Sequence, residues 1–506
     1  MNQYFNRLLK KYLCMKNKLK WIVIQLVVII AFGSCSDDFF NELPSDRVNP
    51  DHALNSLAEA EFACEAPLAI LQDVMPQMVF ACDLLSDATT TTDNADNYWQ
   101  NINNHEFSVD NPYLNPSALY QVVINTNESL LHVDSIMNKD VDMTDIDLQI
   151  LKANLIGLRS WAYFTIARLY GEVAYLKDNM PEYSPDKVVY VSREAIMDTL
   201  INNLLPYLVN DHMKTEDGIV YQSWLPMYNK ALIGEIYLEK QDYVNAATYL
   251  KMAIEGWENS TGTYKVSNTY AKKNWLNIFV NYSSAEIMSY VPFSYYNKQL
   301  NPIELWYGHD RDYLAKPTTG IVNQFSSQVL VKGKVPGDIY RGLDISYKIV
   351  NEDTVVNKYS LTESNLSELS SWIILYRAAD IHLLLAEAMN RSGNSAIALS
   401  ILNDGYKKFT NWSSCVGIRG RVYLQNRTVP EGVDSVTCIE DYILEERSLE
   451  LAFEGKRWFD LMRVARRRDN SYLADKVAAK FDDANQANVI REKLMNEQNW
   501  YLPFQK

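Results

Sequence analysis

Alternating carboxylate and guanidinium groups in one C-terminal stretch are the residues whose spacing most suggests chemistry. The stretch reads EERSLELAFEGKRWFDLMR, and Glu446, Glu450 and Glu454 lie four residues apart, on one face of a predicted helix. Carboxylates this close could act as a general acid and a general base. Arg447 and Arg457 lie among them, and arginines interleaved with glutamates are typical of a structural ion-pair network. We favour the network and keep acid–base chemistry as the alternative.

Other signatures of catalysis or metal binding are missing from the sequence. No GxGxxG, P-loop, HExxH or GxSxG pattern occurs in it. Its six histidines are scattered, so no spacing typical of metal ligands appears. His309, in the sequence GHDRD, is followed by two carboxylates, those of Asp310 and Asp312, but a solvated turn explains this pattern equally well. The sequence therefore predicts a protein that is not an enzyme and that holds no metal and no cofactor.

Aromatic residues next to amides and carboxylates are better candidates for a site. Tryptophan and tyrosine rings can stack on the apolar face of a sugar, while neighbouring Asn and Asp side chains bond its hydroxyl groups. Two segments have this composition, residues 97–101 and residues 294–313. For each aromatic residue taken alone, packing in the core is the alternative. The predicted ligand-binding residues are Asn97, Tyr98, Trp99, Asn101, Tyr296, Trp306 and Tyr307.

Helices must position these residues, because helical periodicity fills most of the chain. In residues 228–254, Gly234 and Ala246 fall at the small-residue offsets of the tetratricopeptide pattern, where two antiparallel helices approach closely. A looser copy of the pattern occupies residues 372–409. We therefore expect a helical-repeat scaffold, mainly over residues 117–257 and 371–465.

Local breaks in the helical pattern predict where single helices end. Pro67 and Pro76 should break a helical segment over residues 55–80. Gly455 should end the helix of the C-terminal stretch, with Lys456 and Arg457 at the negative end of its dipole.

Two segments lack a helical period and are rich in turn residues, residues 83–116 and residues 261–370. They contain both aromatic clusters. We therefore expect residues 51–506 to form a single domain, in which an irregular region with short β elements supplies the ligand site.

The N-terminus has the form of an export signal. Residues 16–20 contain three lysines, residues 21–32 are almost wholly apolar, and Gly33, Ser34 and Cys35 follow. The apolar run is too short to span a bilayer, which takes about 20 helical residues. We expect a signal peptide over residues 1–34, whose true start could be Met15, then lipidation of Cys35 and a tether over residues 35–50. Ordinary secretion, with an unmodified cysteine, is the alternative.

Charge and cysteine content limit the possible partners and cross-links. Residues 1–34 contain six basic and no acidic residues, so the rest of the chain carries a formal charge of −21. A surface this acidic repels phosphate backbones, which argues against a nucleic-acid partner. Four further cysteines are too dispersed for a disulfide framework, so one or two disulfides and buried thiols are both compatible with Cys64, Cys82, Cys415 and Cys438.

Several stretches of the sequence resemble the SusD/RagB family of bacterial outer-membrane nutrient-binding lipoproteins. The C-terminal stretch EERSLELAFEGKRWFDLMR is closely similar to the signature of that family. LRSWAYFTIARLYGEVAYL and YRAADIHLLLAEAMNR resemble two of its helices, although Ala174 stands where proline is usual. CSDDFFNELPSD, which begins at Cys35, resembles the N-terminus of the family after lipidation. The resemblance covers essentially the whole chain after the signal.

The resemblance implies a mostly α-helical, SusD-like fold with four tetratricopeptide-like helix pairs. It also implies a lipid-anchored position in the outer membrane, facing the exterior. The implied partner is a SusC-like TonB-dependent transporter, to which the protein would deliver a captured glycan or oligosaccharide. The alternatives are a peptide ligand, as in the RagB branch, an anchored scaffold without a ligand, and a surface glycosidase.

Overall fold

The structure is a computed structural model, and the residues that it describes are 55–63, 65–176, 188–208, 213–216, 219–222, 227–261, 277–279, 286–294, 297–308, 312–331, 336–359, 370–404 and 417–504. Residues 56–506 form one compact unit. The predicted signal peptide and tether lie outside the described residues, as do Cys35, Cys64, Tyr296, His309 and Cys415.

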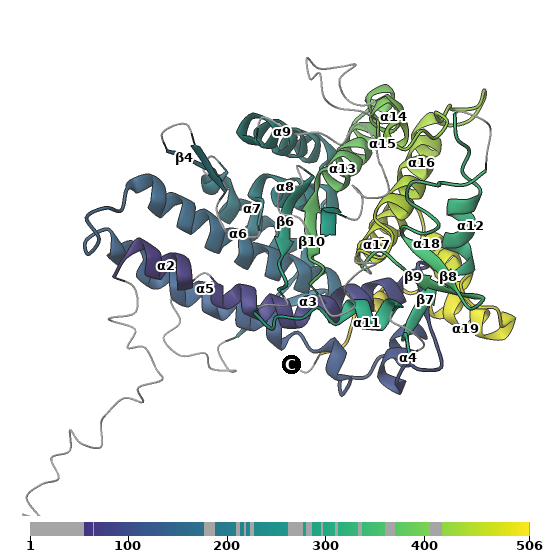
Figure 1. Cartoon of the computed structure of the whole chain (residues 1–506), viewed down its shortest axis with the longest axis horizontal. Coiled ribbons are helices and arrows are strands. Elements are labelled where there is room, and N and C mark those ends of the chain that lie inside the picture. Colours follow the sequence, from purple (N-terminus) through teal and green to yellow (C-terminus); the bar gives the residue numbers. More distant parts are fainter. Residues whose placement is uncertain are drawn as a thin grey trace, which may run out of the picture. The chain divides into compact units, whose positions relative to one another are not determined.

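Three long helices and the short helix α2 build the N-terminal layer, in which α3 and α6 both pack on α5 (Figure 1). Thr144 and Asp147 form a capping box at the start of α6, which satisfies two of the N–H groups that a helix start leaves free. The second half of α6 is buried on every side, as expected for a core helix. The helices of this layer are α2 (Leu57–Ala63), α3 (Glu65–Leu85), α5 (Ser117–Ile136) and α6 (Asp145–Tyr170).

The predicted break at Pro76 is wrong, because α3 continues through this proline. A proline inside a helix costs about 3 kcal/mol, and core packing outweighs that cost, since Met75, Val79 and Phe80 are each no more than 3% exposed. Residues 66–85 are apolar and long enough to cross a membrane by those two criteria alone, but 56% of them are buried, and a core helix passes the same test. Cys82 in this helix is a buried free thiol.

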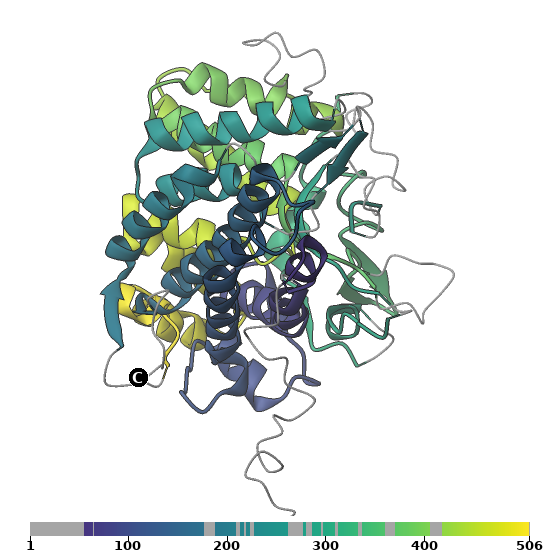
Figure 2. The ribbon, with the colours of Figure 1, turned by 90° about the vertical axis from the view of Figure 1, so that its left-hand side faces the viewer.

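Paired helices follow α6, as the tetratricopeptide pattern predicts, and the two views show them stacked in layers (Figures 1 and 2). Gly234 lies in the predicted close contact, because a Cβ atom there would be 2.7 Å from Leu250 Cγ. In α13, His382 is a core histidine whose Nδ1 lies 2.8 Å from the Ala378 carbonyl. The packed helices are α7 (Arg193–Leu204) on α6, α8 (Asn229–Glu239) on α9 (Tyr243–Thr261), and α13 (Ala378–Arg391) on α9 and α14 (Ser395–Asn403).

The described strands form antiparallel two-stranded sheets. Strand β10 corrects only the start of the helix pair predicted over residues 372–409, because residues 373–377 are buried and pair with β6 before α13 begins. The pairs are β1 (Thr89–Thr91) with β7 (Ala315–Pro317), β2 (Glu172–Tyr175) with β3 (Val189–Ser192), β4 (Met213–Glu216) with β5 (Ile219–Gln222), β6 (Ile287–Val291) with β10 (Ile373–Arg377), and β8 (Tyr347–Val350) with β9 (Asp353–Val356).

Short helices occupy the two segments that the sequence predicts as irregular. Residues 83–116 therefore do not form one continuous loop, since they contain β1, a helix and a 3-10 turn. The short helices are α4 (Asn97–Asn103), the 3-10 helix η3 (Pro112–Leu114), α11 (Ile303–Gly308) and α12 (Thr319–Ser326).

The C-terminal stretch folds as two helices joined by a tight turn, but the first helix ends at Glu450 rather than at Gly455. Lys358 Nζ donates hydrogen bonds to the backbone carbonyls of Glu450 (3.2 Å) and Ala452 (2.7 Å). In a longer helix these carbonyls would accept from backbone N–H groups of the helix. Arg457 accordingly opens the next helix instead of closing the first. The helices of this part are α15 (Ile418–Arg421), α16 (Ser435–Glu450), α17 (Arg457–Arg467), α18 (Asn470–Ala478) and α19 (Ala484–Leu494).

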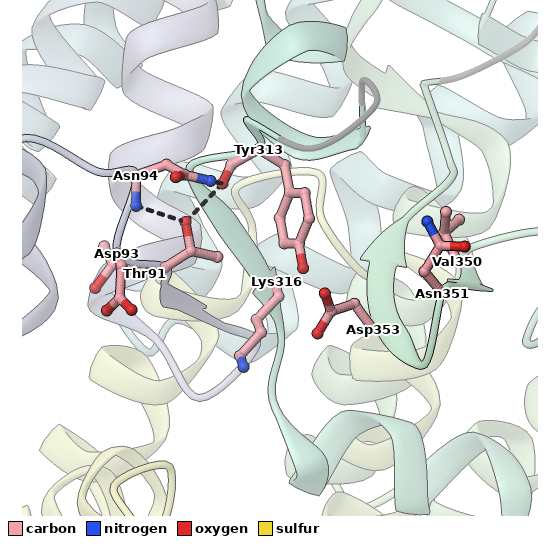
Figure 3. A pocket seen from close by; sticks show the side chains of 9 residues that line it. Thr91, Asp93, Asn94, Tyr313, Lys316, Val350, Asn351 and Asp353 are labelled. Atoms are coloured by element: carbon pink, nitrogen blue, oxygen red, sulfur yellow. Dashed lines mark hydrogen bonds between the residues drawn. The ribbon is translucent and has the colours of Figure 1, made fainter.

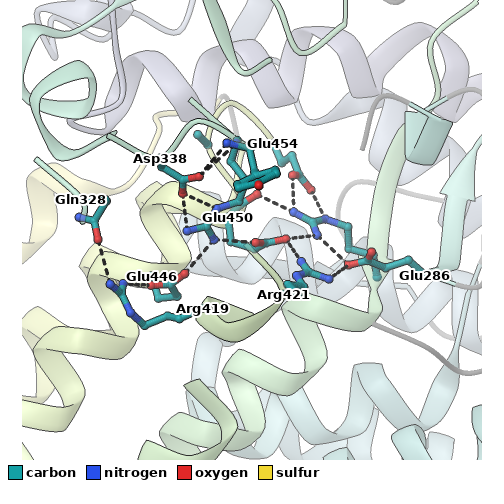
Figure 4. Close-up of polar contacts among 12 residues, drawn as sticks. Glu286, Gln328, Asp338, Arg419, Arg421, Glu446, Glu450 and Glu454 are labelled. Atoms are coloured by element: carbon teal, nitrogen blue, oxygen red, sulfur yellow. Dashed lines mark hydrogen bonds and ion pairs between the residues drawn. The ribbon is translucent and has the colours of Figure 1, made fainter. Parts of the chain in front are cut away.

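The glutamates of this stretch form a buried ion-pair network, which confirms the structural interpretation (Figure 4). Glu450 accepts from Arg341 (2.7 Å), Arg377 (2.7 Å) and Arg421, and its side chain is fully buried. Burial opposes the ionisation of Glu450, but the three arginines outweigh it and hold its pKa well below the usual value. The neighbouring pairs are Glu446 with Arg341 and Arg419, and Glu454 with Lys358 and Arg377.

Candidate functional site

The two segments predicted to carry the site meet in the ribbon formed by β1 and β7, in which Thr90 lies opposite Lys316. Beyond the ribbon, Thr92 Oγ1 donates to the Tyr313 carbonyl at 2.6 Å, and Asn94 Nδ2 donates to the same oxygen at 3.3 Å. The backbone N–H of Thr92 donates to the Leu314 carbonyl at 2.9 Å. Residues more than 200 positions apart are thereby fixed into one surface.

This surface forms one wall of a cleft of about 610 Å³, and the β8–β9 hairpin forms the other (Figure 3). Small-molecule sites typically have volumes of about 300 to 1,000 Å³, so the size suits a ligand. Apart from Val350, every lining side chain has a hydrogen-bonding group. We call this site the ribbon cleft, and its lining is Thr91, Thr92, Asp93, Asn94, Tyr313, Lys316, Val350, Asn351 and Asp353.

The hairpin wall presents Asn351 from a strained turn. Val350 pairs with Asp353, so Asn351 and Glu352 form a two-residue turn, and their φ angles are 51° and 73°. Turns with both central residues at positive φ suit the twist of a hairpin and usually contain glycine. Such strain is common where a side chain must be held in a particular place, and Asn351 is one of the residues that line the cleft.

Ionic and hydroxyl groups make the ribbon cleft strongly polar. The Tyr313 ring points its hydroxyl toward the Asp353 carboxylate (Figure 3). Burial, and after it the Asp353 carboxylate, raise the pKa of Tyr313, so its hydroxyl keeps its proton at neutral pH. Lys316 and Asp93 form no ion pair with the residues that the structure describes, which leaves both charges available to a ligand.

Helix α4 divides the first predicted aromatic cluster between two faces. Asp96 caps the helix, because its Oδ1 accepts from the Trp99 backbone N–H at 2.9 Å. Tyr98 is 45% exposed and Asn97 is exposed as well, whereas Asn101 is half-buried. In the chain, α4 comes directly after the loop that lines the ribbon cleft.

The other predicted rings converge around Phe80 in the core. The ring centroids of Trp99 and Trp306 lie 5.8 Å apart, at 4.8 and 5.4 Å from that of Phe80. Trp99 is 2% exposed and Tyr307 is 1% exposed, so neither ring has a face open to a ligand here. Trp306 is half-buried, and its carbonyl accepts from the Leu314 N–H at 2.7 Å. The cluster thus supports the cleft from inside, and a direct role of its rings in binding stays a prediction.

Tyr113 links the buried cluster to the surface. Its ring stacks on Trp99 at 3.9 Å between centroids, and its hydroxyl donates to Asp96 Oδ2 at 2.8 Å. Tyr98 contacts Tyr113 edge to face, at 6.1 Å. Together these two tyrosines supply a partly open aromatic surface next to Asp96, which follows the cleft residue Asn94 by two positions in the chain.

Neither a metal centre nor a catalytic pair emerges from the described part of the chain. It contains no group of three or more His, Cys, Asp or Glu side chains that could hold a metal ion. The carboxylates of the Glu450 network are buried and held by guanidinium groups, so they are not placed to act on a ligand.

The sequence predicts Tyr98 and the aromatic-rich segment that ends at Tyr313, but it does not single out the cleft residues Tyr313, Lys316, Asn351 and Asp353. The stretch YKIVNEDTVV has two alternating runs around an Asn-Glu pair, and this signal for a hairpin could have found Asn351. No local pattern indicates that β1 pairs with β7, since that pairing is purely tertiary.

Comparison with known proteins agrees with this architecture. Residues 342–506 match the SusD family. A SusD-like protein of Formosa agariphila is 34% identical over 115 residues, which are 22% of this chain and 21% of that protein.

Solved structures share the fold over most of both chains. A SusD superfamily protein of Bacteroides thetaiotaomicron has a TM-score of 0.64 and 17% identity, over 89% of this chain and 95% of its own. A SusD superfamily protein of Bacteroides vulgatus has a TM-score of 0.63 and 16% identity, over 88% and 95%. A laminarin-binding SusD-like protein has a TM-score of 0.60 and 18% identity, over 84% and 94%.

These likenesses confirm the predicted mostly α-helical, SusD-like fold. The matched residues 342–506 include the two helices of the C-terminal stretch and Glu450 itself. The C-terminal third of the chain is thus similar in sequence to the SusD family, and the chain as a whole has a SusD-like fold.

Proposed function

We propose that the protein is a cell-surface lipoprotein that captures a polysaccharide or oligosaccharide and delivers it to a SusC-like TonB-dependent transporter. Members of the SusD family bind glycans and work with SusC-like transporters in general, and they are associated with the outer membrane as lipoproteins. The observation that supports the proposal most directly is the polar ribbon cleft, together with the exposed ring of Tyr98, four residues along the chain from the cleft residue Asn94.

The groups around the cleft suit a sugar. Tyr98 offers a ring on which the C–H face of a pyranose can stack, with Tyr113 beside it. Asp93, Asn94 and Asn351 offer carboxylate and amide groups for hydroxyls. Such a site binds without breaking a bond, so the protein would contribute capture, and the transporter would move the ligand.

A peptide ligand is the second candidate, because the cleft is more charged than a purely aromatic sugar platform. Asp93, Lys316 and Asp353 could pair with charged side chains or chain ends of a peptide. An extended peptide would also bond through its backbone to the edge of the ribbon.

Binding measurements with single variants test the glycan proposal. Soluble protein starting at Ser36 would be titrated with laminarin, other polysaccharides and mixed peptides by calorimetry. Stacking on one aromatic ring contributes about 1 to 2 kcal/mol, so Tyr98→Ala should weaken glycan binding roughly tenfold. Asn351→Ala should weaken it too. Tyr423→Ala is the matched control, because Tyr423 is 39% exposed and lies outside the cleft lining.

The results separate the candidates. Glycan binding that Tyr98→Ala and Asn351→Ala weaken, and that Tyr423→Ala leaves unchanged, would support the proposal. Binding of peptides alone would favour the second candidate. Full glycan affinity in both cleft variants would place the site elsewhere on the protein.

Anchoring and partnership need separate tests. A Cys35→Ala variant should lose metabolic labelling by a palmitate analogue and should leave the membrane fraction. Wild-type protein should co-purify with a TonB-dependent transporter from outer membranes and should be digested by protease added to intact cells. Protection from the protease would contradict an outward orientation.

A further inference from the structure

A second, smaller cavity of about 160 Å³ lies at the far end of the β1–β7 ribbon from the ribbon cleft. The Thr318 N–H donates to the Ala88 carbonyl at 3.0 Å and fixes this end of the ribbon. The N-terminus of α12, the end of α3, and parts of α16 and α18 surround the space. We call it the α12 cavity.

Positive charge predominates in the α12 cavity. Three cationic residues line it, Arg457, Lys476 and Lys480, and Asp87 is the one carboxylate in the lining. Asp87 is already held by Arg457 through two hydrogen bonds, of 2.7 Å to Nε and 2.9 Å to Nη2. Burial alone would raise the pKa of Asp87, but Arg457 and Lys476 hold it below its usual value. The carboxylate is therefore ionised, and the charge of the two lysines is left over.

Neither lysine forms an ion pair with a described residue. Lys480 Nζ donates to the backbone carbonyls of Leu84 and of Ser86, the latter at 3.1 Å. An ammonium group has three N–H donors, so one donor is left for a further acceptor. Burial lowers the pKa of Lys480 to about 7, although the Asp87 carboxylate raises it, so an anion in the cavity would stabilise the charged form of this lysine further.

The start of α12 adds backbone N–H donors, which favour an anion as the lysines do. Thr318 caps the helix through Oγ1, which accepts from the Ile321 N–H at 3.3 Å. Gly320, in the first turn, lines the cavity, and a Cβ atom there would meet only Thr318 Oγ1, at 3.6 Å. Free N–H groups and the positive end of a helix dipole both favour an anion.

We propose that the α12 cavity binds a small oxyanion of the sulfate, phosphate or carboxylate class. The cavity is large enough for a tetrahedral ion with water, or for the acidic group of a sugar. Lys476 and Lys480 would supply the charge, and the first turn of α12 would supply the N–H donors. This inference is independent of the proposed glycan site, because no residue lines both spaces.

Anion titrations at constant ionic strength test the proposal on soluble protein. Sodium sulfate, sodium phosphate and sodium glucuronate would be added against sodium chloride, with glucose as the neutral control. Thermal unfolding and calorimetry would report binding. We expect a saturable rise in melting temperature with at least one oxyanion, and none with chloride or glucose. A response to the inorganic ions would indicate a free ion as ligand, and a response to glucuronate alone would indicate an acidic sugar.

Two variants locate the ion. Lys476→Glu should weaken anion binding at least tenfold, and because Lys476 is exposed its fold should be unaffected. Gly320→Asp adds a carboxylate at the cavity lining, where a Cβ atom makes only an ordinary contact with Thr318 Oγ1, and should also weaken anion binding at least tenfold. Lys298→Glu is the control, since Lys298 is an exposed lysine outside the cavity. Absence of saturable anion binding in the wild type would overturn the proposal. So would an anion affinity in Lys476→Glu and Gly320→Asp that equals the affinity of the wild type.

Discussion

The Tyr307 hydroxyl donates a hydrogen bond to Asp83 Oδ2 at 2.7 Å, although 224 residues separate the two in the chain. The other carboxylate oxygen of Asp83 accepts from the Gly455 N–H at 3.1 Å. One buried carboxylate thus joins α3, helix α11 of the irregular region, and the turn of the C-terminal stretch. The surface that includes the ribbon cleft is therefore tied to the helical scaffold through Asp83.

Tyr307→Phe should destabilise the protein by about 1 to 3 kcal/mol, because it leaves a buried carboxylate with one hydrogen bond fewer while the ring packing is kept. Urea unfolding would measure the change in free energy. Tyr98→Phe is the matched control, since the Tyr98 ring is 45% exposed, and it should change stability by less than about 0.5 kcal/mol. Equal effects of the two variants would show that the Asp83 contact contributes nothing.

Asp83 should make stability fall as the pH rises from about 4 to 7. Burial raises its pKa from 3.8 to about 7, against the hydrogen bonds from Tyr307 and Gly455, which lower it. Between these values the folded protein holds a proton that the unfolded chain has lost, so the contribution decreases by up to about 1.4 kcal/mol per pH unit. Unfolding free energies of wild type and Asp83→Asn at several pH values would measure it. Identical pH slopes would contradict this assignment.

Glu450→Gln should cost about 3 to 5 kcal/mol, because it removes the negative charge shared by three buried arginines. Glu445→Gln, on the same helix, is the control. Glu445 is 31% exposed in its pair with Arg427, so its loss should cost no more than about 1 kcal/mol. Chemical denaturation of both variants would decide, and similar losses would argue against a special role for the buried network.

Trp99→Ala should act on stability, whereas Tyr98→Ala should act on binding, although the two residues are neighbours. Trp99 is 2% exposed, and its replacement should cost about 3 to 5 kcal/mol. Tyr98→Ala should leave the unfolding transition within about 0.5 kcal/mol of the wild type. Thermal melts and glycan titrations of both would test this division. A well-folded Trp99→Ala variant with lost affinity would restore Trp99 as a direct ligand contact.

Local sequence signals predict the parts of the fold whose stability is local. The close contact at Gly234 can be predicted from the sequence, because a small residue at this position of the tetratricopeptide pattern lets the next helix along the chain approach closely. The charged face of Glu446 and Glu450 is readable as a network because arginines are interleaved with it. Local signals fail at Pro76 and at Gly455, where contacts from distant segments override them, namely core packing for α3 and Lys358 for the end of α16.

For the candidate site, the sequence predicts which segments take part but not which of their residues line it. Composition indicates the two segments that meet, and it selects Tyr98 on the exposed face of α4. It cannot separate Tyr98 from Trp99, because the direction of each side chain depends on a helix that the composition of residues 83–116 conceals. Lys316 and Asn351 line the same cleft although they lie in different two-stranded sheets, and no single-sequence pattern encodes how those sheets are placed.

The ion pair between Asp87 and Arg457 can form only late in protein synthesis, because 370 residues separate the two in the chain. At about 5 to 20 residues per second, Asp87 leaves the ribosome roughly 20 to 70 s before Arg457. During that interval α3 can already pack on α5, but α17, which contacts α3 in the finished protein, has not yet been made. We therefore expect one side of the apolar helix α3 to stay exposed until the C-terminal helices are available, so the unfinished chain needs protection from aggregation.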